Sequence, residues 1–360
     1  MSQTAAIFHD AYRELNARKL FWITLILSGV VVGAFALIGI NEQGLRIIAW
    51  DLPAPINTQF MSESAFYKLM FVNLGVGFWL SWLAAILALV STASIFPDFV
   101  STGAIDMVLS KPIGRWRLFL TKYATGLLFV ALQVAVFSAA AFLVLGFRGG
   151  TWEPSVFLAI PLVVLFFSYL FCVCALLGIV TRSTIAALLL TLLFWFVIYG
   201  VHTTESTLLL FKFQSEQQVK SINQTLEHES QILSQLKSAE ELNQQSIDRF
   251  ESSVASSQEK LQSAEKTLNQ LSVAHRITMG IKTLLPKTTE TIGLVDRKLV
   301  NMDEIRHMTD ETPQSDMERA QMEFVEEVRD RSPWWIIGTS LLFEVFVLVL
   351  AGWIFSRRDF

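Results

Sequence analysis

The chain has 360 residues, of which 52% are hydrophobic, 12% aromatic and only 17% charged, and its formal net charge is −4. A mean hydropathy of +0.48 is too high for a water-soluble domain of this size, so the composition predicts an integral membrane protein. The two cysteines, Cys172 and Cys174, lie in one apolar run and offer no disulfide framework. The histidines form no cluster with cysteine, so we predict no metal site.

The first 19 residues have an amphipathic pattern. Ile7, Phe8 and Leu15 fall on one helical face, whereas Asp10 and Arg18 fall on the other. This pattern predicts an interfacial helix in the cytoplasmic headgroup layer, ahead of the first membrane span. No small-residue cleavage site follows, so we expect no cleavable signal peptide.

Six segments are long and apolar enough to cross a bilayer core of about 30 Å, which needs about 20 residues per helix. They cover residues 20–40, 69–96, 124–146, 155–180, 184–201 and 334–355. Lys and Arg concentrate in the N-terminal segment, in the loop at 97–122, beside Arg182 and in the C-terminal tail. The positive-inside rule therefore places both termini in the cytoplasm.

A few residues stand out inside these spans. Gly29 and Gly33 form a G-x-x-x-G face suited to close helix packing. Glu344 lies near the middle of the sixth span, where a carboxylate is costly and therefore a candidate functional site. Its possible roles are contact with cargo, protonation linked to a conformational change, or packing as a protonated residue that bonds to Asn73 of span two or Gln133 of span three.

Residues 204–333 separate spans five and six and form a predicted outer domain. They hold 15 Lys and Arg against 22 Asp and Glu, an acidic excess that argues against nucleic acid as a partner. No Gly or Pro occurs between residues 201 and 279, and apolar residues recur at alternating spacings of three and four, which indicates a coiled coil. The apolar seam becomes polar at Glu229, at Glu240 and Asn243, and at Ser257.

A single helix over residues 204–279 would be more than about 100 Å long, and the chain must still return to the membrane. We therefore predict a hairpin with its tip near residues 240–246. The serine-rich stretch 252–257 is an alternative tip. Because neither place has a Gly or Pro, a continuous helix that pairs with a second subunit also stays open.

The loop at 97–122, between spans two and three, has an ordered pattern of an acidic residue, Gly, an apolar run, Lys-Pro and Arg. The residues are Asp98, Gly103, Ile105, Leu109, Lys111, Pro112 and Arg115. A basic membrane anchor explains the charges but not this order. With this loop, the short connection at Arg182, the amphipathic start and the six spans, residues 1–203 and 334–360 resemble the ABC-2 type transporter permease family.

The resemblance implies a six-helix permease of a bacterial inner membrane, in which the loop at 97–122 holds a coupling helix that contacts an ATP-binding subunit. It also implies a second permease copy or a paralogue. The chain itself has no G-x-x-x-x-G-K-[ST] motif, so we expect no enzyme activity in it and expect ATP and Mg²⁺ to bind the partner subunit.

The resulting fold prediction is an all-α membrane protein with six transmembrane helices and an extracytoplasmic coiled-coil insertion between spans five and six. The leading functional hypothesis is the membrane subunit of an exporter. The alternative is a mechanotransmitter, whose coiled coil regulates an extracytoplasmic protein without moving cargo. A scaffold unrelated to ABC transporters is a third class, but it would need no cytoplasmic coupling loop.

Overall fold

The structure is a computed structural model that describes residues 19–48, 50–53, 57–58, 61–101, 114–238, 244–300 and 315–357. The chain forms two compact units, each described here by itself. Unit 1 contains Met1–Tyr199, Leu284–Asp310 and Pro333–Phe360, and unit 2 contains Gly200–Thr283 and Glu311–Ser332. One helix, α9 (Thr184–Ser238), contributes residues to both.

Among the described residues, six helices are long and apolar enough to cross a membrane, and each overlaps one of the six predicted spans. Four lie in unit 1 before α9 and one after it. The first four are α2 (Lys19–Leu37), the composite helix Glu63–Asp98, α7 (Arg115–Arg148) and the composite Pro154–Thr181, and the last is α14 (Pro333–Arg357).

Two of these spans are built from shorter pieces. Pro154–Thr181 consists of η2 (Pro154–Leu158) and α8 (Ala159–Thr181), and Glu63–Asp98 contains α3 (Glu63–Met70), η1 (Phe71–Ala84), α4 (Ala85–Thr92) and the first residues of α5 (Ile95–Ser101). η1 is a π-helix, with one extra residue between bonded groups relative to an α-helix. The Ser81 hydroxyl accordingly donates to the Val76 carbonyl, five residues back, at 2.7 Å.

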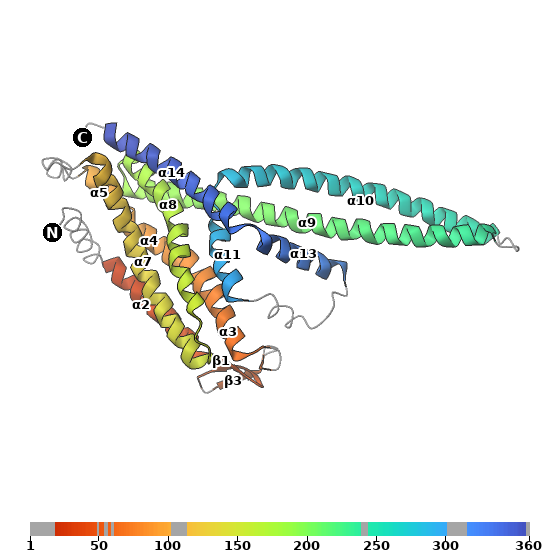
Figure 1. The fold of residues 1–360 in the computed structure, drawn as a ribbon, viewed down its shortest axis with the longest axis horizontal. Helices are drawn as coiled ribbons and strands as arrows, with labels where there is room; N and C mark the ends of the chain where they lie inside the picture. The colour runs from red at the N-terminus through yellow and green to blue at the C-terminus, as the bar shows by residue number, and fades with distance from the viewer. Residues whose placement is uncertain are drawn as a thin grey trace. The chain divides into compact units, whose positions relative to one another are not determined.

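The centre of unit 1 is α8, which contacts α7, α14, α11 (Thr288–Leu299) and α5. Its sequence is apolar on all sides, as expected of a helix enclosed by others. Phe167, Tyr169 and Phe171 on α8 are each almost fully buried. Figure 1 shows α8 within this helix group, beside α14 and α7.

Unit 1 also contains a small sheet that the sequence prediction missed. The first predicted span reached residue 40, but α2 ends at Leu37 and the chain at once enters β1 (Ile38–Asn41), followed by β2 (Gly44–Ile47) and β3 (Trp50–Pro53). The strands pair antiparallel in the order β1-β2-β3. The Asn41 side chain accepts hydrogen bonds from the backbone amides of Gln43 and Gly44, which fixes the first turn.

The boundary of the predicted outer domain is corrected by α11. We expected residues 204–333 to form one domain, yet Leu284–Asp310 group with unit 1. α11 is amphipathic, and its apolar residues Val295 and Leu299 join the core of the long helices because they face α8 and its neighbours.

Unit 2 consists of the second part of α9, α10 (Gln244–Leu284) and α13 (Asp316–Asp330). α9 and α10 lie side by side (Figure 1), and residues later in α9 contact residues earlier in α10, so the two helices are antiparallel. The predicted tip overlaps the break between Ser238 and Gln244, and residues 239–243 lie outside the described part. The alternative tip at 252–257 lies within α10 and is wrong.

Candidate functional site

The segment predicted to couple to an ATPase is entered through α5. Phe96 is buried against Phe119 and Phe171, with ring centroids 5.3 and 6.2 Å apart. The next residue, Pro97, lies so close to Gly178 of α8 that a methyl group there would contact its ring atoms at 3.1 Å. Asp98 is exposed on the same short helix. The entry to the segment is therefore fixed to α8.

The chain leaves this segment through the first turns of α7. The Arg115 guanidinium donates from Nη1 to the Ser356 carbonyl at 2.9 Å, near the C-terminus of α14. The Trp116 ring lies against Gly352, and a methyl group at that glycine would overlap it. Phe119 packs on Phe355, with ring centroids 6.0 Å apart. We call these α7–α14 contacts, centred on Arg115, Trp116 and Gly352, the cytoplasmic junction, after the side predicted for them.

Arg182 lies at the end of α8. Its backbone amide donates to the Gly178 carbonyl at 3.0 Å, and its φ of 53° is left-handed, a conformation that usually favours glycine. Arg115 and Arg182 thus place positive charge at the C-termini of α14 and α8, where the helix dipoles are negative. Their observed backbone contacts are structural, and a coupling role for either stays a prediction.

The rest of the predicted coupling pattern lies outside the described residues. This applies to Gly103, Ile105, Leu109, Lys111 and Pro112, and also to the amphipathic stretch before Lys19. The structure shows how the two ends of residues 97–122 are held, with Pro97 against α8 and Trp116 against α14.

The carboxylate of Glu344, in the middle of α14, has different partners from those predicted. Its Oε1 accepts from the Tyr123 hydroxyl of α7 and its Oε2 from the Ser168 hydroxyl of α8, both at 2.8 Å. Asn73 donates to the Leu69 carbonyl of its own helix and is exposed. Gln133 is buried on α7 and borders a small cavity. The structure therefore corrects the expected grouping of Glu344, Asn73 and Gln133.

Gln133 borders a small cavity in unit 1. The cavity is formed by residues from α2, the composite helix Glu63–Asp98, α7 and α8, including Ser28 and Thr24. The Nε2 of Gln133 has no hydrogen-bond partner among the described residues. Gly29 and Gly33, predicted to pack closely, have open space around their α-carbons in this single chain.

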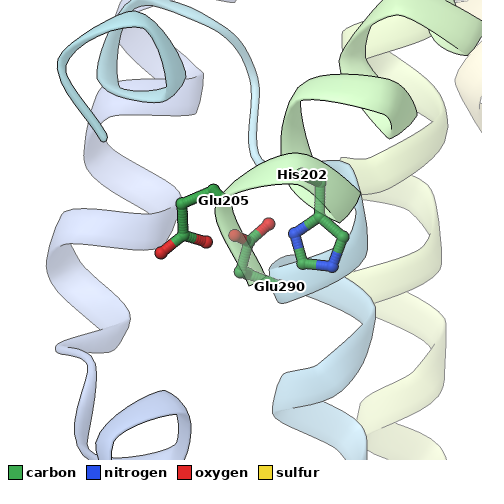
Figure 2. A group of neighbouring side chains, drawn as sticks. All are labelled: His202, Glu205 and Glu290. Carbon is green, nitrogen blue, oxygen red and sulfur yellow. The ribbon is translucent and has the colours of Figure 1, made fainter. Parts of the chain in front are cut away.

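Unit 2 contains a buried ion network that the sequence analysis did not identify. Figure 2 shows His202 and Glu205 within one turn of α9; Glu290, drawn in the same view, belongs to α11 of unit 1. Glu205 is fully buried. Its carboxylate accepts from both Nη atoms of Arg331, at 2.5 and 3.2 Å, and from the Lys282 ammonium at 2.5 Å.

His275 adds a fourth contact, from its Nε2 to Oε1 of Glu205 at 3.0 Å. The network thus joins α9, α10 and the residue that follows α13. Burial alone would raise the pKa of Glu205, but the hydrogen bonds from Arg331 and the charge of Lys282 outweigh it and lower the pKa to about 2. Glu205 lies beyond the predicted fifth span, which ends at residue 201, and it is ionised at neutral pH.

Further contacts bind α9 to α10 toward the hairpin end. Two polar interruptions of the predicted seam pair with each other, because Glu229 accepts from the hydroxyls of Ser253 and Ser257 at 2.6 and 2.9 Å. These hydrogen bonds lower the pKa of Glu229. Lys237 and Glu251 form an ion pair of 2.7 Å close to the ends of the two helices.

Comparison with known proteins adds one family. A family described as "Protein of unknown function (DUF2705)" matches residues 48–219. This range contains β3, the α7 side of the cytoplasmic junction and the part of α9 that enters unit 2, but not α14. No curated protein and no solved structure matches the chain.

Proposed function

We propose that this chain is the membrane-spanning permease subunit of an ATP-driven transporter of the ABC-2 type, an exporter in a bacterial inner membrane. A separate subunit would bind ATP and Mg²⁺ and would push on residues 97–122. The observation that carries the proposal is the anchoring of both flanks of this segment, Pro97 on α8 and Trp116 on α14. A displaced segment would therefore move two long helices.

The contacts deeper in unit 1 support such a transmission path. α14 carries both Gly352 of the cytoplasmic junction and Glu344, and Glu344 bonds to α7 and α8. A shift of α14 relative to α7 would have to break or re-form these bonds. Unmade hydrogen bonds in an apolar interior are costly, which favours discrete arrangements over gradual sliding.

The experiment that tests this proposal compares two glycines of α14. Gly352 contacts the Trp116 ring, whereas Gly338 has open space around its α-carbon. We expect Gly352→Ala to uncouple the permease from the ATPase activity of its co-purified partner subunit, and Gly338→Ala to leave that activity unchanged. Equal ATPase activity in both variants, with normal complex assembly, would mean that the cytoplasmic junction does not support the coupling proposal.

A second candidate function is mechanotransmission, and unit 2 favours it. In this scheme the antiparallel α9 and α10 form an extracytoplasmic coiled coil that passes motion to an outer protein. Through Glu205, α9 and α10 bind Arg331, which lies two residues before α14 begins. Movement of α14 would then be transmitted along the chain to the base of the hairpin. Deletion of residues 212–275 discriminates: retained export makes the hairpin accessory, while loss of only a partner's activity supports mechanotransmission.

The open glycine face of α2 bears on assembly. A methyl group at Gly29 or Gly33 would meet no atom of the described residues within 4 Å, so this face is available to a second permease copy or a paralogue. A Gly33→Leu substitution should then weaken dimer formation without unfolding the monomer, measured by the mass of the purified complex.

A further inference from the structure

The small sheet of unit 1 has one apolar and one polar face. The pairing aligns Ile38 with Ile47 and Ile47 with Trp50, and it aligns Leu45 with Leu52, so these side chains share one face. The other face carries polar groups: Arg46 forms an ion pair with Asp51 at 3.9 Å, and the Asn41 amide donates to Asp51 at 2.6 Å. The sheet is therefore amphipathic.

The apolar face is covered at β1 and uncovered at β3. Ile40 on β1 is only 5% exposed, whereas Ile47 is 40%, Leu52 48% and Trp50 82% exposed. β1 is held in place because the Tyr67 hydroxyl donates to the Ile38 carbonyl at 2.8 Å. The hairpin of β2 and β3 thus extends an apolar surface beyond the helices that anchor it.

The tip of this hairpin lacks the polar and flexible residues that are typical of a turn exposed to water. Turns usually contain Gly, Asn, Asp or Ser, but the two residues between Ile47 and Trp50 are Ile48 and Ala49. Ile48 adopts a left-handed φ of 58°, which is a rare conformation for a β-branched residue, and its side chain is 66% exposed. The exposure of Ile48 is unfavourable unless something apolar surrounds the tip.

The position of the sheet indicates what surrounds it. No residue separates the end of α2 at Leu37 from the start of β1 at Ile38. If α2 spans the bilayer, β1 therefore begins at the depth of the headgroups, where Trp side chains are enriched. Leu37 is itself 49% exposed, so the outward-facing surface of α2 continues into the apolar face of the sheet.

A protein partner fits this surface less well. The edge strand β3 contains Asp51 and Pro53, which oppose pairing with another strand. Four exposed side chains at one hairpin also fall short of the roughly 800 Å² per partner that a stable interface buries. We infer that the β2–β3 hairpin inserts Ile48, Trp50 and Leu52 into the headgroup boundary of the phospholipid bilayer, with Arg46 and Asp51 facing water.

This inference rests on the membrane location proposed above, and the experiment separates the two. A fluorescent label is attached in turn to Trp50→Cys, Leu52→Cys, Arg46→Cys and Val30→Cys in the full chain, reconstituted in phosphatidylcholine vesicles. Cys172 and Cys174 are buried and compete little for the label. Lipid brominated near the headgroup end of the acyl chain probes contact with the bilayer, and iodide probes contact with water.

We expect brominated lipid to remove most of the fluorescence at positions 50 and 52, and iodide to quench position 46 instead. Val30 is 63% exposed within α2 and serves as the membrane control. Quenching by lipid at position 30, with iodide quenching at 50 and 52, overturns the inference but not the membrane location. Protection of positions 50 and 52 from both quenchers, with cross-linking between copies at position 50, overturns it in favour of a dimer contact. Absence of lipid quenching at position 30 overturns the membrane location itself.

Discussion

The Glu205 network makes the hairpin base sensitive to one substitution. Glu205→Gln leaves Arg331 and Lys282 in place but removes the carboxylate that both contact. Removing one partner from a buried ion pair costs about 3–5 kcal/mol. The lowered pKa gives a similar figure, because a shift from 4.5 to about 2 corresponds to about 3 kcal/mol of stabilisation by the ionised form. We therefore expect unit 2 to open locally in this variant.

Hydrogen exchange measures that opening in the full chain. About 3 kcal/mol corresponds to protection factors about 100-fold lower, and the loss should appear in the amides of α10 around His275 and Lys282. Glu227→Gln, an exposed carboxylate on the same helix, is the control and should change nothing. Unchanged protection around residues 275–282 in Glu205→Gln would refute the reasoning.

The same pKa sets the pH dependence. Because the folded-state pKa of Glu205 is below the ordinary value of 4.5, the stabilisation is complete above pH 4.5 and is lost as the pH falls toward 2. Protection factors in α10 of the wild-type chain should therefore fall across this range. In Glu205→Gln the fall should be smaller, since the group that titrates is gone.

Three further substitutions test unit 1. Arg115→Ala should lower thermal stability by about 1–2 kcal/mol, because it removes a charged donor from the α14 C-terminus; Ser356→Ala keeps the accepting carbonyl and should match wild type, and equal loss in both variants would refute the contact. Tyr123→Phe should cost about 1–3 kcal/mol in thermal unfolding, because Glu344 loses one of its two donors; a neutral result would show that this bond does not hold α7 to α14. Arg182→Gly should raise stability by up to about 1 kcal/mol by relieving the left-handed backbone, and a fall of the melting temperature would show that the Arg side chain contributes more than the strain costs.

The sequence could predict the long helices because length and apolar content are sufficient for them. All six apolar runs became helices of that kind, and the polar break near residue 240 coincides with the gap between α9 and α10. The sheet had a signal that was overlooked. Apolar residues alternate at Ile38 and Ile40 and again at Leu45 and Ile47, on either side of Asn41, but the first pair continues an apolar run and was read as the end of a span.

The site contacts could not be predicted in the same way. Glu344 was recognised from its depth in a span, but depth does not tell which neighbouring helix the carboxylate faces, so Tyr123 and Ser168 replaced the expected partners. Glu205 meets Lys282 and Arg331 across separations of 77 and 126 residues. No local periodicity encodes such pairs. A single acidic residue just beyond an apolar run was the available signal.

We propose above that residues 97–122 receive the motion of an ATP-binding subunit. A photo-crosslinking amino acid at position 109 tests this proposal, with position 46 on the small sheet as the control. We expect a covalent adduct at position 109 with a protein that carries a phosphate-binding loop, at a yield that changes with ATP, and no such adduct at position 46. Absence of an ATP-binding protein at position 109, or equal capture at both positions, would contradict it.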